Sequence, residues 1–338
     1  MKKSAVDWKL VIGLCISAIF MYLAFRDVDF GKMLHAFTSV KYGYLVPVLV
    51  IIFCSHFLRA LRWRYLLDPI QRVDLKTLFT SLMLGYMANI FLPAHLGEFV
   101  RAFLVGKKQP VPAGAVFGTV VIERIIDVFT MLLLLVIAIM VFPFPDWVKK
   151  SGYISFAFIL LLFVALVVMK KYQKRTLGMV ETLLRFLPDH FSAKLKSLLC
   201  SFLEGIVPLK HRRDYIVVTI LSIVIWLCYG LIFQIAFFAF DFVSFYALPW
   251  SAALIILVTT TFSVLVPSSP GYVGTYHYIC QITLGWFGVP QSEALTFAFL
   301  VHGINFLPVL LLGLVLLSIE GMSLKNIESS ARTSESVK

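Results

Sequence analysis

Long apolar runs separated by short polar connections dominate the pattern of hydrophobic and polar positions along the chain. A helix needs about 20 apolar residues to cross the hydrocarbon core of a bilayer. Five uninterrupted runs approach or exceed that length, and they cover residues 10–25, 43–58, 154–169, 215–240 and 294–318. A sixth run, 116–141, is as long but carries charged residues. The pattern predicts an all-α polytopic membrane protein with about six full transmembrane helices.

Two further apolar segments are each interrupted by a cluster of proline and glycine, at residues 91–98 and 265–274. Both breaks share the spacing Pro-x-x-x-Gly, and their prolines and glycines are Pro93, Gly97, Pro267, Pro270, Gly271 and Gly274. Proline and glycine both disfavour a helix interior, so each break divides its segment into two short helices. The sequence leaves two interpretations open, namely two re-entrant hairpins or simple turns between ordinary spans.

The 30 basic residues outnumber the 18 acidic ones, which gives a net charge of +12. Most of this excess lies in connections between apolar runs, notably 59–76 and 170–213, so the positive-inside rule explains it and we expect no nucleic-acid partner. Composition agrees, because 60% of the residues are hydrophobic and only 14% are charged. We therefore expect a multi-pass protein of a bacterial or archaeal cytoplasmic membrane, with both termini in the cytoplasm.

Counting spans from a cytoplasmic amino terminus gives the two breaks opposite orientations. The first hairpin then enters from the cytoplasm and the second from outside. Inverted pairs of broken helices mark a midplane substrate site in transporters. We therefore predict an inverted repeat within one transmembrane domain, 1–320, followed by a short cytoplasmic tail, 321–338. The basic segment 171–213 has apolar residues at helical spacing and is predicted to lie at the membrane interface.

Ionisable residues inside apolar runs cost about 2.5 to 3.5 kcal/mol each at the bilayer centre on insertion scales, so they are normally paired or face a wet cavity. Glu98 and Arg101 are three residues apart after the first break and are predicted to pair on one helix face. Glu123, Arg124 and Asp127 lie together on the sixth run. Mutual neutralisation explains the acids, whereas a guanidinium group also matches the geometry of a phosphate. Arg101 and Arg124 are therefore the candidate phosphate ligands.

A third set of charged residues, Arg59, Arg62 and Arg64, lies at the end of the second span, with Trp63 and Tyr65 beside it in the sequence. Arginine and aromatic residues at this depth usually anchor a helix at the membrane interface. We interpret the group as such an anchor, with the alternative that Arg62 or Arg59 reaches a lipid phosphate.

Histidines lie in or near both breaks, at His95, His277 and His302. Their spacing matches no metal motif, the glycines form no nucleotide-binding pattern, and the five cysteines form no paired motif. We therefore expect no metal and no cofactor, and we interpret the histidines as hydrogen-bonded interior residues. A proton-coupling role for His95 or His277 is the alternative.

Three strings of residues, in this order and at these separations, carry a resemblance to a known family: Phe91-Leu-Pro-Ala-His-Leu-Gly-Glu-Phe-Val-Arg101, Glu123-Arg-Ile-Ile-Asp127 and Pro267-Ser-Ser-Pro-Gly-Tyr-Val-Gly274. They resemble the transmembrane flippase-like region of bacterial lysylphosphatidylglycerol synthases and its stand-alone relatives. The resemblance covers about residues 8–320. It implies a lipid-translocating fold with two re-entrant helices, and no lysyl transfer, because we expect the soluble synthase domain to be absent. Family members often have arginine where His95 stands, and commonly glycine and then glutamate where Tyr272 and His277 stand.

These observations favour a transporter, not an enzyme, that binds an anionic lipid headgroup at the midplane and moves it between leaflets. The predicted headgroup ligands are Arg101, Arg124, Glu98, Glu123, Asp127, His95, His277 and Arg62, and the prolines and glycines of the breaks are predicted to shape the cavity. An anionic phospholipid, a polyprenyl phosphate and a glycolipid all fit. One alternative is an accessory subunit that presents a lipid-linked precursor to a separate glycosyltransferase or lipid-modifying enzyme. Another is an intramembrane enzyme that uses His95 or His277 with a carboxylate.

Overall fold

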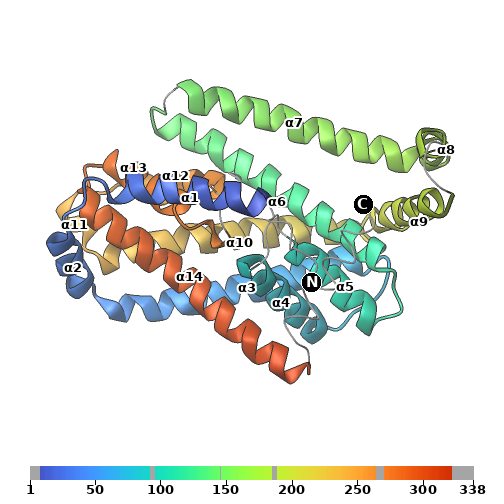
Figure 1. The fold of residues 1–338 in the computed structure, drawn as a ribbon, viewed down its shortest axis with the longest axis horizontal. Helices are drawn as coiled ribbons and strands as arrows, with labels where there is room; N and C mark the ends of the chain where they lie inside the picture. The colour runs from blue at the N-terminus through green and yellow to red at the C-terminus, as the bar shows by residue number, and fades with distance from the viewer. Residues whose placement is uncertain (1–7, 92–95, 145, 185–188, 264–269, 322–338) are drawn as a thin grey trace, which may run out of the picture.

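The computed structural model describes residues 8–91, 96–144, 146–184, 189–263 and 270–321. Within these ranges every regular element is helical, so the predicted all-α fold is confirmed (Figure 1). The elements are, in chain order, α1 (Trp8–Phe25), α2 (Phe30–Ser39), η1 (Tyr42–Tyr44), α3 (Leu45–Leu67), α4 (Leu75–Phe91), α5 (Gly97–Lys108), α6 (Ala113–Val141), α7 (Asp146–Lys171), α8 (Gln173–Leu184), α9 (Asp189–Gly205), α10 (Arg212–Ala239), α11 (Phe242–Phe245), α12 (Ser251–Ser263), η2 (Pro270–Tyr272), α13 (Thr275–Gly285) and α14 (Gln291–Ile319). The predicted tail beyond residue 321 lies outside the described residues.

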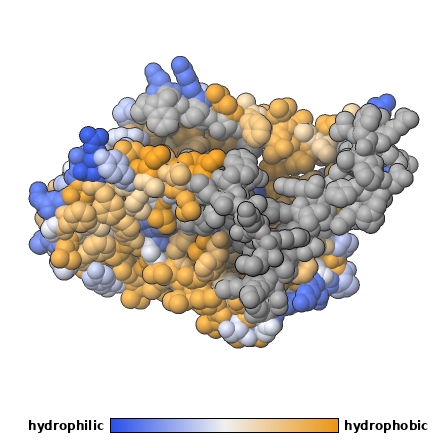
Figure 2. All heavy atoms as spheres, viewed as in Figure 1, coloured by the Kyte–Doolittle hydropathy of each residue, from blue (hydrophilic) through white to orange (hydrophobic). Residues whose placement is uncertain are grey.

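Five of the described helices are long and apolar enough to cross a membrane: η1 with α3, then α6, the larger part of α7, α10 and α14. The remaining predicted span, residues 10–25, corresponds to α1. Its apolar part, Ile12–Phe25, is shorter than the other five within the described residues. Large apolar side chains cover the outside of the long helices, among them Met140, Leu161, Ile216 and Leu311. Figure 2 shows hydrophobic surface over the middle of one face and hydrophilic residues mainly at its edges. A water-soluble bundle rarely exposes so much contiguous apolar surface, so the protein is a multi-pass membrane protein.

Three of the loops that are predicted to be external lie together at one end of the molecule, where polar side chains join them. Lys41, which follows α2, pairs with Asp241 at 2.6 Å. The hydrogen bond from Lys41 to Asp241 raises the pKa of the lysine. The hydroxyl of Tyr246 donates to Glu293 at 2.8 Å, which joins the connection before α12 to the start of α14. The segments after α2, after α10 and before α14 therefore meet.

The predicted cytoplasmic connections meet at the other end. Lys108, at the end of α5, pairs with Glu320 after α14 at 2.5 Å. Lys210, before α10, lies 3.4 Å from Asp68, which follows α3. These contacts therefore gather the connections that were predicted to be external at one end and those that were predicted to be cytoplasmic at the other.

Two helical hairpins correspond to the two predicted breaks. α4 packs against α5, and α12 packs against α13. Figure 1 places the first pair and the second pair toward opposite ends of the long axis. Pro93, His95 and Pro267 lie outside the described residues, and entry of the hairpins into a bilayer stays a prediction.

In the first hairpin, α4 and α5 approach each other closely at two glycines, Gly85 and Gly97. A Cβ atom on Gly97 would lie 1.9 Å from the carbonyl oxygen of Gly85 and 2.6 Å from Oδ1 of Asn89. That oxygen of Asn89 accepts a hydrogen bond from the backbone N–H of Gly97 at 2.7 Å. An asparagine on α4 therefore satisfies one of the free N–H groups at the start of α5.

The second break has a strongly irregular backbone. Gly271, Tyr272 and Gly274 all have positive φ, at 76°, 56° and 96°, a conformation that glycine adopts freely and tyrosine rarely. A Cβ atom on Gly274 would lie 2.5 Å from the carbonyl oxygen of Ser17. The break is therefore held against α1, and α13 begins directly after this contact.

Within the described residues, the basic segment between α7 and α10 forms two helices, α8 and α9, in agreement with its helical spacing of apolar residues. In addition, α9 packs closely on α6, since a Cβ on Gly205 would lie 2.1 Å from the carbonyl oxygen of Ala115 and one on Gly118 would lie 2.6 Å from that of Phe202. The interfacial location of the segment stays a prediction, but the carboxyl end of α9 belongs to the packed bundle.

Candidate functional site

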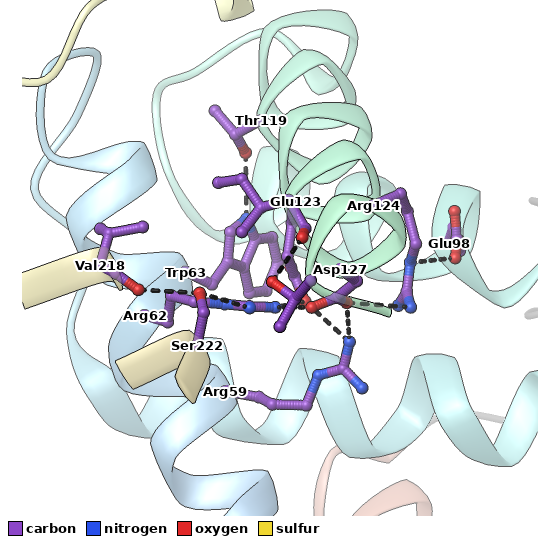
Figure 3. Close-up of polar contacts among 12 residues, drawn as sticks. Arg59, Arg62, Trp63, Glu98, Thr119, Glu123, Arg124, Asp127, Val218 and Ser222 are labelled. Atoms are coloured by element: carbon purple, nitrogen blue, oxygen red, sulfur yellow. Dashed lines mark hydrogen bonds and ion pairs between the residues drawn. The ribbon is translucent and has the colours of Figure 1, made fainter. Parts of the chain in front are cut away.

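Seven charged side chains from α3, α5 and α6 form one largely buried group, hereafter the charged cluster, and Figure 3 labels all of them except Arg101. Its members are Arg59, Arg62, Glu98, Arg101, Glu123, Arg124 and Asp127. Residues three or four positions apart share a helix face, so each of the three helices presents its charges on one side. α6 packs against both α3 and α5, and the charged sides of the three helices face one another.

Glu123 is the centre of the charged cluster and is completely buried. Its Oε1 lies 3.3 Å from Nη2 of Arg62 and 3.4 Å from Nη2 of Arg59, and its Oε2 lies 2.9 Å from Nη2 of Arg101. Asp127, one turn further along α6, pairs with Arg62 at 2.7 Å and also with Arg59. Two carboxylates on α6 therefore hold three arginines from two other helices.

The remaining pair lies at the edge of the charged cluster. Nε of Arg124 is 2.5 Å from Oε1 of Glu98, and its Nη1 is 3.5 Å from Asp127. The side chains of Arg124 and Glu98 are 31% and 16% exposed, whereas those of Arg101 and Glu123 are 1% and 0% exposed. Arg124 and Glu98 are therefore the most accessible part of the cluster.

Neutral partners fix the orientation of the arginines of α3. Nη1 of Arg62 donates to the hydroxyl of Ser222 at 3.0 Å, and Nη1 of Arg59 donates to the hydroxyl of Tyr229 at 2.9 Å. Both partners lie on α10, the helix that packs along α3. The guanidinium group of Arg59 also lies 5.6 Å from the centre of the Tyr86 ring, within the range of a cation–π contact.

Arg101 is held by one acid and one aromatic ring. Its guanidinium carbon lies 4.8 Å from the centre of the Trp63 ring, and the indole N–H of Trp63 donates to Thr119 at 3.0 Å. Beyond its ion pair with Glu123, Nε and Nη1 of Arg101 are buried and have no hydrogen-bond partner among the described residues. Arg101 therefore keeps N–H groups that can donate hydrogen bonds to an anion.

The charged cluster has four arginines and three carboxylates among the residues that the structure describes, which leaves one positive charge. Electrostatic interactions join Glu123 to all four of these arginines. A buried unbalanced charge is costly, so the cluster is suited to a ligand that carries one negative charge.

Two predicted features of this region are wrong, because the local spacing does not determine which helix supplies a partner. Glu98 and Arg101 do not pair with each other. Instead Glu98 pairs with Arg124, and Arg101 pairs with Glu123. Arg62, interpreted as an interfacial anchor, is fully buried in the charged cluster. Arg59 joins it, and only Arg64 of the three is exposed.

Arg124 and Asp127, which lie together on the sixth run, form an ion pair at 3.5 Å across one turn of α6. Sequence reasoning missed Ser222, Tyr229 and Tyr86, which are single polar residues on apolar helices and offer no local signal. The spacing of Arg59 and Arg62, one turn apart, does place both on one face and was the available sign of an inward role.

His277 belongs to a second buried group at the break before α13. Its Nε2 lies 3.3 Å from Nδ1 of His302, and its ring packs on Phe299 at 4.2 Å between centroids. Of the predicted headgroup ligands, the structure therefore brings together Arg62, Glu98, Arg101, Glu123, Arg124 and Asp127, while His277 lies in this other group and His95 is outside the described residues. The described residues contain no cluster of three metal-ligating side chains.

Comparison with known proteins agrees with this architecture. A family described as lysylphosphatidylglycerol synthase TM region matches residues 10–313. A UPF0104 membrane protein of Methanocaldococcus jannaschii is 20% identical over 319 residues, which are 91% of this chain and 94% of that protein. A UPF0104 membrane protein of Methanothermobacter thermautotrophicus is 24% identical over 308 residues, 87% of this chain and 90% of that protein. The glycosyltransferase AglD of Haloferax volcanii is 24% identical over 122 residues, only 36% of this chain and 20% of that protein.

Proposed function

The chain belongs to the family of lysylphosphatidylglycerol synthase transmembrane regions, and from this premise we propose that it moves a lipid between the leaflets of a cytoplasmic membrane by binding the phosphate of the headgroup at the charged cluster. The acyl chains would stay in the lipid phase. The protein would act as a transporter, without a covalent step, and both termini would face the cytoplasm.

The observation that carries this proposal is the surplus positive charge of the charged cluster, together with the unused donors of Arg101. Arginine offers a planar set of donors that matches phosphate oxygens, and hydrogen bonds between charged partners are stronger than neutral ones. A phosphate carrying one negative charge would neutralise the cluster and satisfy these donors.

The cluster would lower the barrier to headgroup transfer because it replaces the water around the phosphate with fixed partners. Arg124 and Glu98 would meet the headgroup first, since their side chains are the most exposed of the cluster. The phosphate would replace Glu98 as the ion-pair partner of Arg124, and the headgroup would then move inward toward Arg101. Movement of the two oppositely oriented hairpins would expose the site to each leaflet in turn.

Transport in proteoliposomes tests the proposal. Purified protein is reconstituted with phosphatidylglycerol labelled with a fluorophore on one acyl chain, and chemical quenching of the outer leaflet reports transfer. We expect Arg101→Gln to slow transfer about ten-fold, the effect of losing one charge-assisted hydrogen bond. Arg64→Gln is the matched control, because Arg64 is exposed on α3, outside the charged cluster. Equal rates for a folded Arg101→Gln protein and for the control would contradict the proposal.

A second candidate function is suggested by the similarity to AglD, which is a glycosyltransferase by name. In this alternative, the chain binds a lipid-linked precursor and presents it to a separate glycosyltransferase or lipid-modifying enzyme. Reconstitution distinguishes the two functions, because only a transporter moves lipid in the absence of any partner. A protein that binds phosphate-bearing lipids but moves none would favour the accessory role.

A further inference from the structure

The break before α13 holds two buried histidines that take no part in the charged cluster. His277 is 2% exposed and His302 is 8% exposed. Three aromatic rings surround them, with centroids 4.2 Å from His277 for Phe299 and 4.8 Å and 4.3 Å from His302 for Tyr276 and Phe306. In the part of the chain that the structure describes, no aspartate, glutamate, lysine or arginine side chain forms an ion pair or hydrogen bond with either imidazole. A neutral state therefore suits both rings.

Hydrogen bonds assign the proton positions of both neutral rings. The backbone N–H of Gly274 donates to Nδ1 of His277 at 3.3 Å, so His277 carries its own proton on Nε2. This proton is donated to Nδ1 of His302, also at 3.3 Å. His302 must then carry its proton on Nε2, at the far side of its ring.

Nε2 of His302 is the end of this chain of hydrogen bonds. The atom is buried and makes no hydrogen bond of regular geometry to a described residue, and its one polar neighbour there is the backbone of Gly271, which interacts with the ring. A buried N–H group with such a poorly placed acceptor regains only part of what it loses when its bonds to water are removed. An acceptor supplied by a ligand at the break would remove this cost.

Aromatic residues connect His302 to the accessible edge of the charged cluster. The ring of Phe306, which packs on His302, lies 6.4 Å from the ring of Tyr272. Tyr272 in turn is close enough to Arg124 and Glu98 to interact electrostatically with both. The unused donor and the most exposed charges therefore flank one aromatic region.

We propose that Nε2–H of His302 binds the uncharged, hydroxyl-bearing part of the headgroup whose phosphate lies at the charged cluster. This inference rests on the proposed function and names its substrate class, which is a lipid with a single phosphodiester charge and a polyol or sugar headgroup. A hydroxyl oxygen accepts from the imidazole, and the C–H face of a polyol packs on the surrounding rings. A charged amine or carboxylate would meet no opposite charge on the histidine pair.

Lipid competition tests this substrate class. Protein in nanodiscs of phosphatidylcholine is offered phosphatidylglycerol and phosphatidylethanol with the same acyl chains, and bound lipid is quantified by native mass spectrometry. Both probes carry one phosphodiester charge, but only phosphatidylglycerol has headgroup hydroxyls. We expect the wild type to prefer phosphatidylglycerol about five-fold, as one hydrogen bond allows. His302→Phe should lose this preference and still bind phosphatidylethanol, while His35→Phe, at an exposed position of α2, should keep the preference.

Each outcome separates the inference from the function on which it rests. Equal binding of the two probes by the wild type, or an unchanged preference in His302→Phe, overturns the role of His302 and leaves the phosphate site standing. Binding of neither probe contradicts the proposed function itself. Should His302→Phe fail to fold, a third probe tests the substrate class on the wild type. Phosphatidylserine has a charged headgroup and must then bind less well than phosphatidylglycerol, and equal binding of these two lipids overturns the inference.

Discussion

Glu123 is the residue on which the charged cluster depends most, because it lies within ion-pair distance of three arginines and is fully buried. Removing one partner of a buried ion pair leaves the others uncompensated, at about 3 to 5 kcal/mol. We therefore expect Glu123→Gln to lower the free energy of unfolding by that amount, measured by chemical denaturation in detergent.

Glu98→Gln is the matched control for this measurement. Among the described residues, Glu98 forms an ion pair with one arginine, Arg124, and both side chains are partly exposed, so water can replace the lost carboxylate and the expected loss of stability is clearly smaller. Equal losses for the two variants would show that Glu123 does not hold the cluster together.

The sequence identified the charged residues of the site but not their pairing. Charges at bilayer depth are costly, so Glu98, Arg101, Glu123, Arg124 and Asp127 stood out from their apolar surroundings. Which acid meets which arginine depends on how α3, α5 and α6 rotate against one another, and no local spacing contains that information. The inward role of Arg59 and Arg62 was missed for the same reason.

At the scale of single elements, the start of α4 shows how a cap depends on pH. Oδ1 of Asp74 accepts from the backbone N–H of Thr77 at 2.8 Å, and the hydrogen bonds from Thr77 lower the pKa of Asp74. Because the folded-state pKa lies below the unfolded value, the stabilisation is present above the unfolded pKa and is lost as the pH falls through the folded one. We expect Asp74→Ala to cost about 1 kcal/mol at pH 7.

The pH dependence distinguishes this cap from a general packing effect. The difference in unfolding free energy between wild type and Asp74→Ala should shrink as the pH falls below the ordinary pKa of an aspartate, about 3.9. It is followed by chemical denaturation in detergent at a series of pH values. A difference that stays constant down to the lowest pH would mean that the charge of Asp74 has no part in it.

Glycines set the distance between the arms of the first hairpin. A Cβ on Gly97 would lie 1.9 Å from the carbonyl oxygen of Gly85, so Gly97→Ala must push α4 and α5 apart. We expect a loss of about 1 to 3 kcal/mol or more, seen as a lower unfolding temperature in detergent.

Gly230→Ala provides the comparison for this substitution. In the middle of α10, the nearest atom to a new Cβ is 4.0 Å away, and alanine favours a helix over glycine by about 0.5 to 1 kcal/mol. This variant should unfold at the same or a higher temperature. If Gly97→Ala were equally stable, the close contact between α4 and α5 would be wrong.

Long helices were predictable from the sequence, because an apolar run of spanning length rarely forms anything but a transmembrane helix. The short helices beside the two breaks were predicted from proline and glycine, but other short elements and their packing were not. The helix α2 has a mixed composition and follows a span directly, and the packing of α9 on α6 depends on Gly118 and Gly205, which are single residues in ordinary helical surroundings. Tertiary contacts between such positions leave no periodic signal.

At the scale of the whole molecule, the counting of basic loops predicted which connections lie together, as the pairs Lys41–Asp241 and Lys108–Glu320 illustrate. We predict that the end with Lys41 faces outward and the end with Lys108 faces the cytoplasm. In a cysteine-free background, a membrane-impermeant thiol reagent should label Tyr42→Cys in intact cells and Lys107→Cys only after permeabilisation. The reverse pattern would invert the proposed topology.

The central claim is that the charged cluster binds the phosphate of a lipid headgroup, and mass spectrometry of lipids that co-purify with the protein tests it most directly. Wild type, Arg101→Gln and the control Arg64→Gln are purified in the same mild detergent. We predict that one class of phosphate-bearing anionic lipid is enriched with the wild type and the control, and that this class is lost from Arg101→Gln. No enriched lipid, or the same enrichment in all three proteins, would show that the arginines serve only as structural ion pairs.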